Sequence, residues 1–350
     1  MNKHIAFFKE LIGDYCFSDE LSREGYSHDE TEDIRVMPLC VLKPGTVDEV
    51  SKILTYCNAN QLPITPMGAR TGLSGGAIPA LNGVALSMER FNRILDIDEN
   101  NHQIITEPGV ITQVLQETVK EKGLFYPPDP ASKGSCFIGG NVSENSGGPK
   151  AVKYGVTKDY VLNLEVVLAD GNVIWTGANV LKNATGYNLT QLIVGSEGTL
   201  GVVTKIVLKL LPHPTADLLL LVPFHSAKQA CEAVAAIYRK GIVPSGLEFM
   251  ERDALRWTQQ FTGDFSIEVK ETHEAHLLIE VDGFDPNQLM QECEKILGVL
   301  EGFETDEILF ALVIVSGIVF AFSKEKTEEN VSKSTPYIMV CYIRVRYWKC

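Results

Sequence analysis

The segment at residues 66–76, which reads PMGARTGLSGG, combines four glycines with the hydroxyl side chains of Thr71 and Ser74. Because glycine adopts backbone angles that other residues avoid, such a segment can turn successive N–H groups toward one centre. A concave set of backbone N–H groups binds a phosphate or diphosphate. An ordinary glycine-rich surface loop has the same composition, so both interpretations stay open for this segment alone. We refer to residues 66–76 as the glycine loop.

Four later segments share this polar, glycine-punctuated character. The first, at residues 138–149, contains four glycines and two asparagines, which suits a backbone that lies against a ligand. The other three read KYGVTKD at 153–159, KNATGYNL at 182–189 and GSEGTLGVVT at 195–204. Each of them alone could be a surface turn. Their occurrence in this order after the glycine loop favours one shared ligand site.

Helices and strands alternate around these segments. A capping box of Thr46 and Glu49 opens one expected helix, and Gly123 ends another. Asp170-Gly171 is a two-residue hairpin turn between two strands. Up to Pro212 we expect helices over 2–16, from Thr46 through Cys57 and over 110–122, and strands over 36–42, 62–65, 84–87, 94–97, 103–106, 161–168, 173–175 and 202–211. This mixture predicts an α+β fold with two layers.

After Pro212 the pattern changes to that of a second domain, joined at a proline-rich hinge near residue 213. Strands are expected over 218–222, 247–250, 277–281 and from 307, and helices over 226–240, 253–261 and 287–300. This order is that of a βαβ-type domain.

The end of the chain has a different character. Residues 308–322 are almost all apolar, residues 324–333 are highly charged, and residues 337–350 are aromatic and basic. We weigh an aberrant or frameshifted C-terminus, a buried strand pair and a membrane anchor. A membrane-spanning helix needs about 20 apolar residues, which is more than this run offers, and the first interpretation is favoured.

Composition limits the function further. The 350 residues carry a net charge of −14, which argues against a nucleic-acid partner because such a partner requires a basic face. The eight cysteines form no CxxC pair and show no metal-ligand spacing, so we expect reduced thiols in a cytoplasmic protein. The short apolar run near the N-terminus is interrupted by charges, which is typical of a helix and not of a signal peptide.

Through four segments the chain resembles one family: the glycine loop, GGNVSENSGG at 139–148, KYG at 153–155 and GYNLTQLIVGSEGTLG at 186–201. This is the FAD-dependent oxidoreductases with a PCMH-type flavin domain, the vanillyl-alcohol-oxidase superfamily, and within it the D-lactate dehydrogenase and glycolate oxidase flavoprotein subunit group. The resemblance covers about 36–310. It implies an N-terminal helix and lead-in at 1–35, a two-subdomain PCMH-type FAD-binding domain at 36–213, an incomplete ferredoxin-like α/β cap domain at 214–310 that binds substrate, and an atypical tail at 311–350.

The resemblance also implies which residues bind FAD. The glycine loop would wrap the diphosphate, 138–148 and 198–203 would line the ribityl chain and flavin, and 128–129 would approach the adenine and ring sides. The residues assigned in this way are Pro66, Met67, Gly68, Ala69, Arg70, Thr71, Gly72, Leu73, Ser74, Pro128, Asp129, Ser135, Gly139, Gly140, Asn141, Asn145, Gly147, Gly148, Tyr154, Gly155, Gly198, Gly201, Val202 and Val203.

Two details concern the glycine loop. Family members often have glycine at the position of Arg70, whose guanidinium either pairs with the diphosphate or points to solvent. Members that attach FAD covalently often have a histidine near the end of this loop. No histidine occurs between residues 29 and 101 and no cysteine lies in the loop, so we expect non-covalent FAD.

The implied reaction is the oxidation of a D-2-hydroxy acid of the D-lactate or glycolate type. The C2 hydride passes to flavin N5 and a base accepts the hydroxyl proton. Related enzymes bind the substrate carboxylate with arginines and use histidines, in many members as metal ligands, largely from the second half of the cap and the segment after it. No histidine follows His276. A metal site at His273 and His276 is an alternative to ordinary surface residues, which we favour, and we assign neither a catalytic base nor a metal ligand.

Two other function classes are weighed. The chain could bind FAD without turnover, because residues 311–350 lack the family's C-terminal substrate and metal residues. A nicotinamide dehydrogenase needs G-x-G-x-x-G directly after a strand, and Gly72 to Gly76 do not fit that register. The expected partner is a small 2-hydroxy acid. The electron acceptor is unknown, and association with the inner face of the membrane or with a partner subunit stays open.

Overall fold

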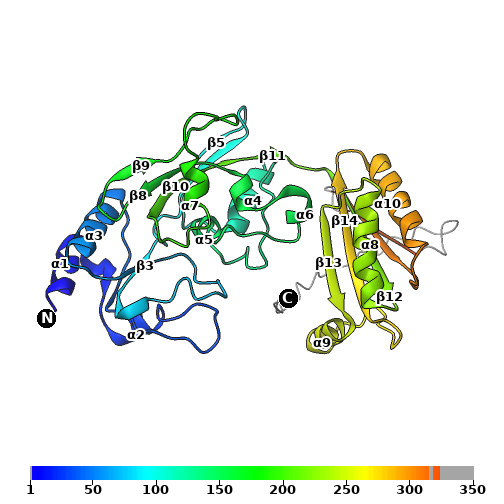
Figure 1. Ribbon diagram of the computed structural model, residues 1–350, viewed down its shortest axis with the longest axis horizontal. Helices are drawn as coiled ribbons and strands as arrows, with labels where there is room; N and C mark the ends of the chain where they lie inside the picture. Colours follow the sequence, from blue (N-terminus) through cyan, green and yellow to red (C-terminus); the bar gives the residue numbers. More distant parts are fainter. Residues whose placement is uncertain (1, 315–317, 324–350) are drawn as a thin grey trace. The chain divides into compact units, whose positions relative to one another are not determined.

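The computed structural model describes residues 2–314 and 318–323. The chain forms two compact units (Figure 1). The first unit comprises Met1–Gly147 and Val156–His213, and the second combines Gly148–Gly155 with the chain from Pro214 onward. A short internal segment therefore belongs to the second unit although both of its neighbours in sequence belong to the first.

The first sheet of the first unit supports the glycine loop. Its strand order is β1 (Cys16–Phe17), β2 (Cys40–Leu42), β4 (Val84–Ser87) and β3 (Ile64–Met67), with β2 and β3 parallel to β4 and β1 antiparallel to β2. Helices α1 (Lys3–Ile12) and α3 (Val47–Ala59) bury apolar residues against this sheet, among them Phe8 and Ile53, and α2 (Glu20–Glu24) lies in the lead-in. The glycine loop begins where β3 ends.

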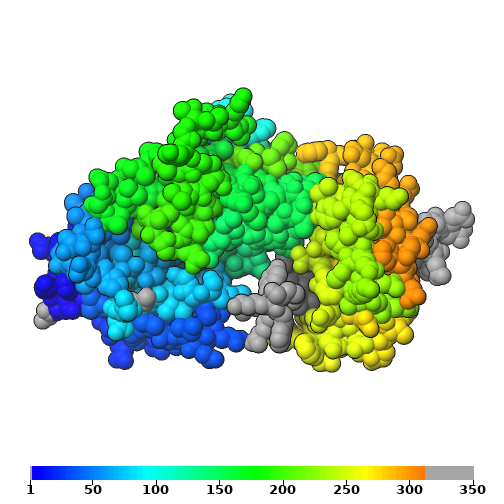
Figure 2. Space-filling model, in the orientation of Figure 1, coloured from blue at the N-terminus to red at the C-terminus, as the bar shows by residue number. Residues whose placement is uncertain are grey.

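The second sheet of this unit is antiparallel throughout. Its order is β5 (Ile94–Asp98), β6 (Gln103–Thr106), β10 (Val202–Lys209), β8 (Val161–Val167) and β9 (Val173–Trp175). Val167 and Val202 reach into the core of the first sheet, which joins the two sheets. Figure 2 shows the blue N-terminal segments and the green segments side by side on one face of this unit. Shorter elements complete it: α4 (Thr112–Lys120), α5 (Ile138–Glu144), α7 (Leu189–Ile193) and the pair β7 (Leu124–Phe125) with β11 (Leu211–Pro212).

The second unit is a five-stranded antiparallel sheet with helices packed on it. The strand order is β13 (Gly246–Glu251), β14 (Ala275–Gly283), β12 (Ala216–Phe224), β15 (Leu309–Ile314) and β16 (Ile318–Ser323). Helices α8 (Ala227–Arg239) and α10 (Pro286–Leu300) share the sheet's core, while α9 (Arg252–Thr262) follows β13 and α6 (Ala151–Tyr154) comes from the internal segment. Strands β12 and β13 run in the same direction with β14 between them, which is a split βαβ arrangement.

Several expected elements have other limits in the structure. The helix expected over 2–16 ends at Ile12, because Gly13 adopts a φ of +59° and a 3-10 turn and β1 follow. The strand expected over 36–42 is paired only from Cys40, and Pro38 has no N–H to donate to a ladder. In the capping box, Thr46 accepts the Glu49 N–H as expected, but the Glu49 carboxylate accepts from the N–H of Gly45.

The end of the chain is described only in part. The strand pair interpretation agrees with β15 and β16, which form an antiparallel pair over Leu309–Ile314 and Ile318–Ser323. The charged and aromatic residues expected at 324–350 lie outside the described residues. Among the described helices, none is both long enough and apolar enough to cross a bilayer.

Candidate cofactor-binding site

The first unit contains a cavity of about 310 Å³. This volume is in the range of roughly 300–1,000 Å³ that is usual for ligand pockets. Its walls come from the glycine loop, from α5 and from the segment that enters β10. Sixteen of the residues assigned to FAD from the sequence line this cavity: Pro66, Met67, Gly68, Ala69, Arg70, Thr71, Gly72, Leu73, Ser74, Gly139, Gly140, Asn141, Gly198, Gly201, Val202 and Val203.

Backbone hydrogen bonds hold these walls in place. The first sheet positions the start of the glycine loop, since the Met88 N–H donates to the Met67 carbonyl at 3.0 Å. The N–H groups of Ile138 and Gly139 donate to the carbonyls of Val110 and Pro108 at 2.9 and 2.7 Å. A Cβ on Gly139 would lie only 2.5 Å from the Cβ of Pro108, so glycine is required there. The α5 segment, which the sequence left as an irregular loop, is thus a short helix anchored beside the glycine loop.

Residues 68–74 and Gly76 of the glycine loop line this cavity, and each carries a backbone N–H donor. Within the described part of the chain, no backbone N–H from Gly68 to Gly76 donates a hydrogen bond to another protein group. Backbone N–H groups that find no protein partner bind water or a ligand. A row of them along a cavity wall is the arrangement that binds a phosphate or diphosphate.

Glycine also allows a ligand to approach the cavity walls closely. A Cβ on Gly68 would lie 3.6 Å from the Cα of Gly140, so the two glycines bring their backbones together. A Cβ on Gly140 or on Gly72 would meet no atom within 4 Å, which means that open space adjoins both positions. The space that side chains at Gly72 and Gly140 would occupy is therefore free. This space fits an extended cofactor that contains a diphosphate.

Arg70 adopts a backbone conformation that favours glycine. Its φ is +60°, which explains why a glycine suits this position of the loop. The guanidinium carbon lies 4.1 Å from the centre of the Tyr26 ring, and the Tyr26 hydroxyl donates to Glu89 at 2.6 Å. The side chain is thus stacked on an aromatic ring at the cavity edge, an arrangement that neither of the two sequence interpretations included.

Three carboxylates in the cavity wall were not predicted: Asp29, Glu144 and Glu197. Burial raises the pKa of the Glu144 carboxyl, and the negative charges of Glu197 and Asp29 raise it further. Glu144 and Glu197 lie inside the glycine-rich segments 138–149 and 195–204. Their position in these segments was the one sequence feature that could have placed them at the site. Gly76, Ser143 and Ser146 also line the cavity and lie inside the assigned segments 66–76 and 138–148. The lining residues outside the assigned segments are Ala77, Met88, Pro108, Ser132, Cys136 and Phe137.

Eight assigned residues lie outside the cavity lining. Pro128, Asp129, Ser135, Asn145 and Gly147 belong to the first unit but do not line this cavity, whereas Gly148, Tyr154 and Gly155 belong to the second unit. Asn145 ends α5 in a left-handed conformation, and its side chain accepts the Lys158 N–H at 2.9 Å. The Tyr154 hydroxyl donates to Asp282 at 2.8 Å. Asn145 therefore stabilises the first unit, and Tyr154 stabilises the second.

The expectation that His273 and His276 are surface residues is wrong. Their exposed fractions are 2% and 1%, because both precede or enter the buried strand β14. Burial lowers the pKa of His276 to about 4, with a further contribution from the neighbouring His273. Within the described residues, neither ring nitrogen of His276 has a hydrogen-bond partner. Among the residues that the structure describes, no histidine lines the cavity of the first unit.

Two protein families match this chain. Residues 38–177 match the family described as FAD binding domain, and residues 213–330 match the C-terminal domain of FAD linked oxidases. The second match extends beyond Ala311, where the sequence analysis expected the resemblance to end.

Curated relatives and solved structures agree with these matches. The glycolate oxidase subunit GlcD of Bacillus subtilis is 42% identical over 87% of this chain and 66% of its own length. The D-lactate dehydrogenase of Archaeoglobus fulgidus is 34% identical over 95% of this chain and 76% of its own. An alkyldihydroxyacetonephosphate synthase structure shares the fold, with a TM-score of 0.74 and 18% identity over 87% of this chain and 60% of that one. This chain spans 54–66% of the length of several curated relatives that it matches.

Proposed function

Because this chain belongs to the family of FAD-linked oxidases, we propose that it binds FAD non-covalently and oxidises a D-2-hydroxy acid of the D-lactate or glycolate type. The observation that carries the proposal is the row of backbone N–H groups from Gly68 to Ser74. These residues line the cavity, and their N–H groups have no protein acceptor in the described chain. Relatives named glycolate oxidase subunit and D-lactate dehydrogenase support the class of substrate.

Each wall of the cavity has a role in this proposal. The N–H groups of the glycine loop hold the diphosphate, and Arg70 adds a positive charge at the edge. Gly139 and Gly140 allow the backbone of α5 to lie against the cofactor, and Val202 and Val203 provide apolar contacts. FAD supplies the acceptor for a hydride from C2 of the hydroxy acid. The protein supplies position and excludes water.

The cofactor is held without a covalent bond in this proposal. The described residues of the cavity lining include no histidine and one cysteine, Cys136. This cysteine is buried, and its thiol lies 3.2 Å from the hydroxyl of Thr112. We assign the FAD-binding domain to residues 36–213 and a partial substrate domain to residues 214–310. Association with a partner subunit is part of the proposal, supported by relatives that are named subunits of a glycolate oxidase.

A second candidate function is FAD binding without turnover. Among the described residues that line the cavity, Arg70 is the only basic side chain and none is a histidine. A 2-hydroxy acid needs a cation for its carboxylate and a base for its hydroxyl proton. The cavity of the first unit by itself therefore suits the cofactor better than the complete reaction.

One experiment separates the two candidates. The full chain is purified with FAD and its visible flavin spectrum is recorded, and the protein is then denatured to test whether the flavin is released. D-lactate, glycolate or D-2-hydroxyglutarate is added without oxygen to a second sample. Bleaching of the flavin supports the oxidoreductase, and a stable yellow colour supports binding without turnover. A protein that takes up no FAD would disprove the cofactor assignment, and flavin that stays attached after denaturation would disprove non-covalent binding.

A further inference from the structure

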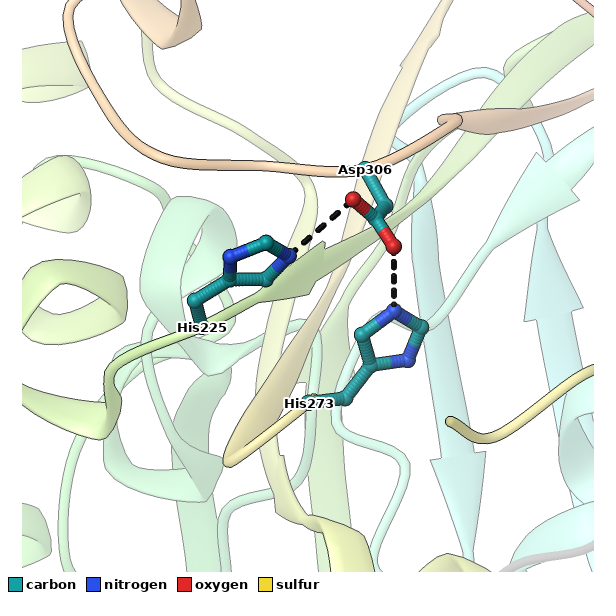
Figure 3. Close-up of side chains that lie close together, drawn as sticks. All are labelled: His225, His273 and Asp306. Atoms are coloured by element: carbon teal, nitrogen blue, oxygen red, sulfur yellow. Dashed lines mark hydrogen bonds and ion pairs between the residues drawn. The ribbon is translucent and has the colours of Figure 1, made fainter. Parts of the chain in front are cut away.

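Two histidines and an aspartate meet at one end of the sheet in the second unit. His225 follows β12, while His273 precedes β14 and Asp306 precedes β15. Strand β12 pairs antiparallel with both neighbours, so its last residue lies beside the beginnings of β14 and β15. The topology thus brings together three residues that are far apart in sequence. Figure 3 shows both imidazole rings directed at the carboxylate.

The geometry of this cluster suits a metal ion. The Nε2 atom of His225 lies 3.0 Å from one carboxylate oxygen of Asp306, and the Nε2 of His273 lies 3.0 Å from the other. One potential ligand atom from each residue lies within 4.8 Å of the others. A tetrahedral metal with nitrogen and oxygen ligands at about 2.0–2.2 Å holds its ligand atoms roughly 3.3–3.6 Å apart, so small side-chain shifts bring these three ligand atoms around one ion.

The backbone around the cluster is fixed before any ligand binds. The N–H of His225 donates to the Glu304 carbonyl, and the N–H of Asp306 donates to the Pro223 carbonyl, both at 3.3 Å. The N–H of Glu274, next to His273, donates to the Phe224 carbonyl at 2.9 Å. All three residues are therefore attached to the end of β12. Binding a metal here would require little ordering of the chain.

One side of the cluster is buried and the other is open to solvent. The side chain of His273 is 3% exposed, whereas those of His225 and Asp306 are 38% and 27% exposed. The buried His276 packs against His273 with 5.1 Å between ring centres, and within the described residues its nitrogens have no hydrogen-bond partner. His276 therefore holds one side of the His273 ring in place, and the cluster is open on the side of His225 and Asp306.

We propose that His225, His273 and Asp306 form a binding site for a divalent transition metal, with Zn²⁺ as the ion that fits these ligands. Imidazole nitrogens and a carboxylate oxygen are the ligands that Zn²⁺ takes in three-residue protein sites, where a fourth position is left to water. The exposed side of the cluster provides that fourth position. All three residues belong to the second unit, and none of them lines the cavity of the first.

Lys270 competes with the metal in this proposal. Its ammonium lies 3.0 Å from the same carboxylate oxygen of Asp306 that His273 contacts, and its backbone N–H donates to the Nδ1 of His273 at 3.3 Å. The side chain of Lys270 is 44% exposed, so it can move into solvent. A metal on Nε2 leaves the proton of His273 on Nδ1, and the long contact from the Lys270 N–H must then open. The metal therefore replaces Lys270 as the cation beside Asp306.

The test is Zn²⁺ binding to the full chain, measured by equilibrium dialysis and elemental analysis. We expect about one Zn²⁺ per wild-type chain, as in other zinc sites. Asp306→Asn and His225→Gln should each weaken binding by more than about tenfold. Lys270→Met should strengthen it, because the competing ammonium is gone. Co²⁺ provides a second measurement, since its visible absorption should change on binding to the wild type and not to Asp306→Asn.

Two controls distinguish Zn²⁺ binding at this cluster from Zn²⁺ binding elsewhere on the surface and from misfolding of a variant. His102→Asn removes an exposed histidine of the first unit and should leave the zinc content unchanged. Circular dichroism with thermal melting shows whether each variant is folded. Retention of no Zn²⁺ by the wild type would overturn the proposal, and so would equal Zn²⁺ affinity in Asp306→Asn, His225→Gln and His102→Asn.

Discussion

The carboxylate of Glu144 stands in the wall of a cavity that is otherwise suited to an anion. A Cβ on Gly76 would lie 2.9 Å from a Glu144 oxygen and 3.4 Å from a Glu197 oxygen, so both acids border the end of the glycine loop. Burial, Glu197 and Asp29 together raise the pKa of Glu144, which means that the folded protein binds its proton more readily than the unfolded chain does. Charge on Glu144 therefore destabilises the fold.

We predict that Glu144→Gln stabilises the protein at neutral pH. Because the pKa is higher in the folded state, Glu144 contributes stability below its unfolded pKa, and this contribution is lost as pH rises through the folded pKa. The variant should have a larger free energy of unfolding than the wild type at pH 7.5, with a gap that closes toward pH 4. Urea unfolding of the FAD-free protein across this pH range measures the gap. Glu10→Gln at an exposed site of the same unit is the control, and a variant that is less stable than wild type at pH 7.5 would refute this account.

For single residues, sequence patterns identified some members of the candidate site and missed others. Gly68 and Gly140 stand out in the sequence because clustered glycines mark places where a backbone must approach something closely. Asp29 had no such signal, since it lies in an acidic lead-in far from the glycine loop. Tertiary hydrogen bonds bring it there: the Glu30 N–H donates to the Gly72 carbonyl at 3.0 Å, and the Ala77 N–H donates to Asp29 at 3.5 Å.

Among the elements, the short α6 helix shows how charge can fix a segment to a sheet. Lys150 is paired with Glu280, and Lys153 lies 2.6 Å from a carboxylate oxygen of Asp282 that also accepts from Tyr154. The side chain of Asp282 is 1% exposed. These contacts place Gly148–Gly155 in the second unit, and nothing in a KYG motif predicts that a buried aspartate more than a hundred residues later is its partner.

We predict that Asp282→Asn destabilises the second unit by about 3 kcal/mol, because removal of one partner leaves a cation without its buried counter-charge. The 148–155 segment should detach from β14 more often, so trypsin should cleave after Lys150 and Lys153 faster than in the wild type. Urea unfolding and limited proteolysis measure the two effects. Glu232→Gln breaks an exposed pair with Lys228 in the same unit and should change stability by no more than about 0.5 kcal/mol. Equal proteolysis of both variants would contradict the role given to Asp282.

Element types were easier to predict than element limits. The strands β4 and β6 have the limits that the sequence predicted, because apolar residues in them are bounded by glycine and polar turns. The helix α5 was not predicted, since Gly139 and Gly140 are poor helix formers. Tertiary contacts hold it, among them the hydrogen bonds from the N–H groups of Ile138 and Gly139. The burial of His273 was likewise hidden, because the polar residues around it resemble a surface turn.

For the whole molecule, the two proposed ligand sites lie in different units. The cavity proposed for FAD is lined by residues of the first unit, and the histidine–aspartate cluster proposed for Zn²⁺ belongs to the second. The order of glycine segments was sufficient to indicate the cofactor, because a dinucleotide needs several backbone approaches and leaves several glycine signatures. The cluster around Asp306 left no pattern in sequence, since its three members are joined only by the pairing of β14, β12 and β15.

The most direct test of the account measures FAD affinity in two glycine variants, one from each unit. Gly140→Ala and Gly298→Ala each place a methyl group in a helix where it meets no protein atom within 4 Å, but only Gly140 lines the cavity. Titration of the FAD-free full chain should give wild-type affinity for Gly298→Ala. Gly140→Ala should bind FAD at least about tenfold more weakly. The reason is that a methyl group that intrudes on a packed contact costs about 1–3 kcal/mol of binding free energy. Identical FAD dissociation constants for the two variants would contradict the placement of the cofactor between the glycine loop and α5.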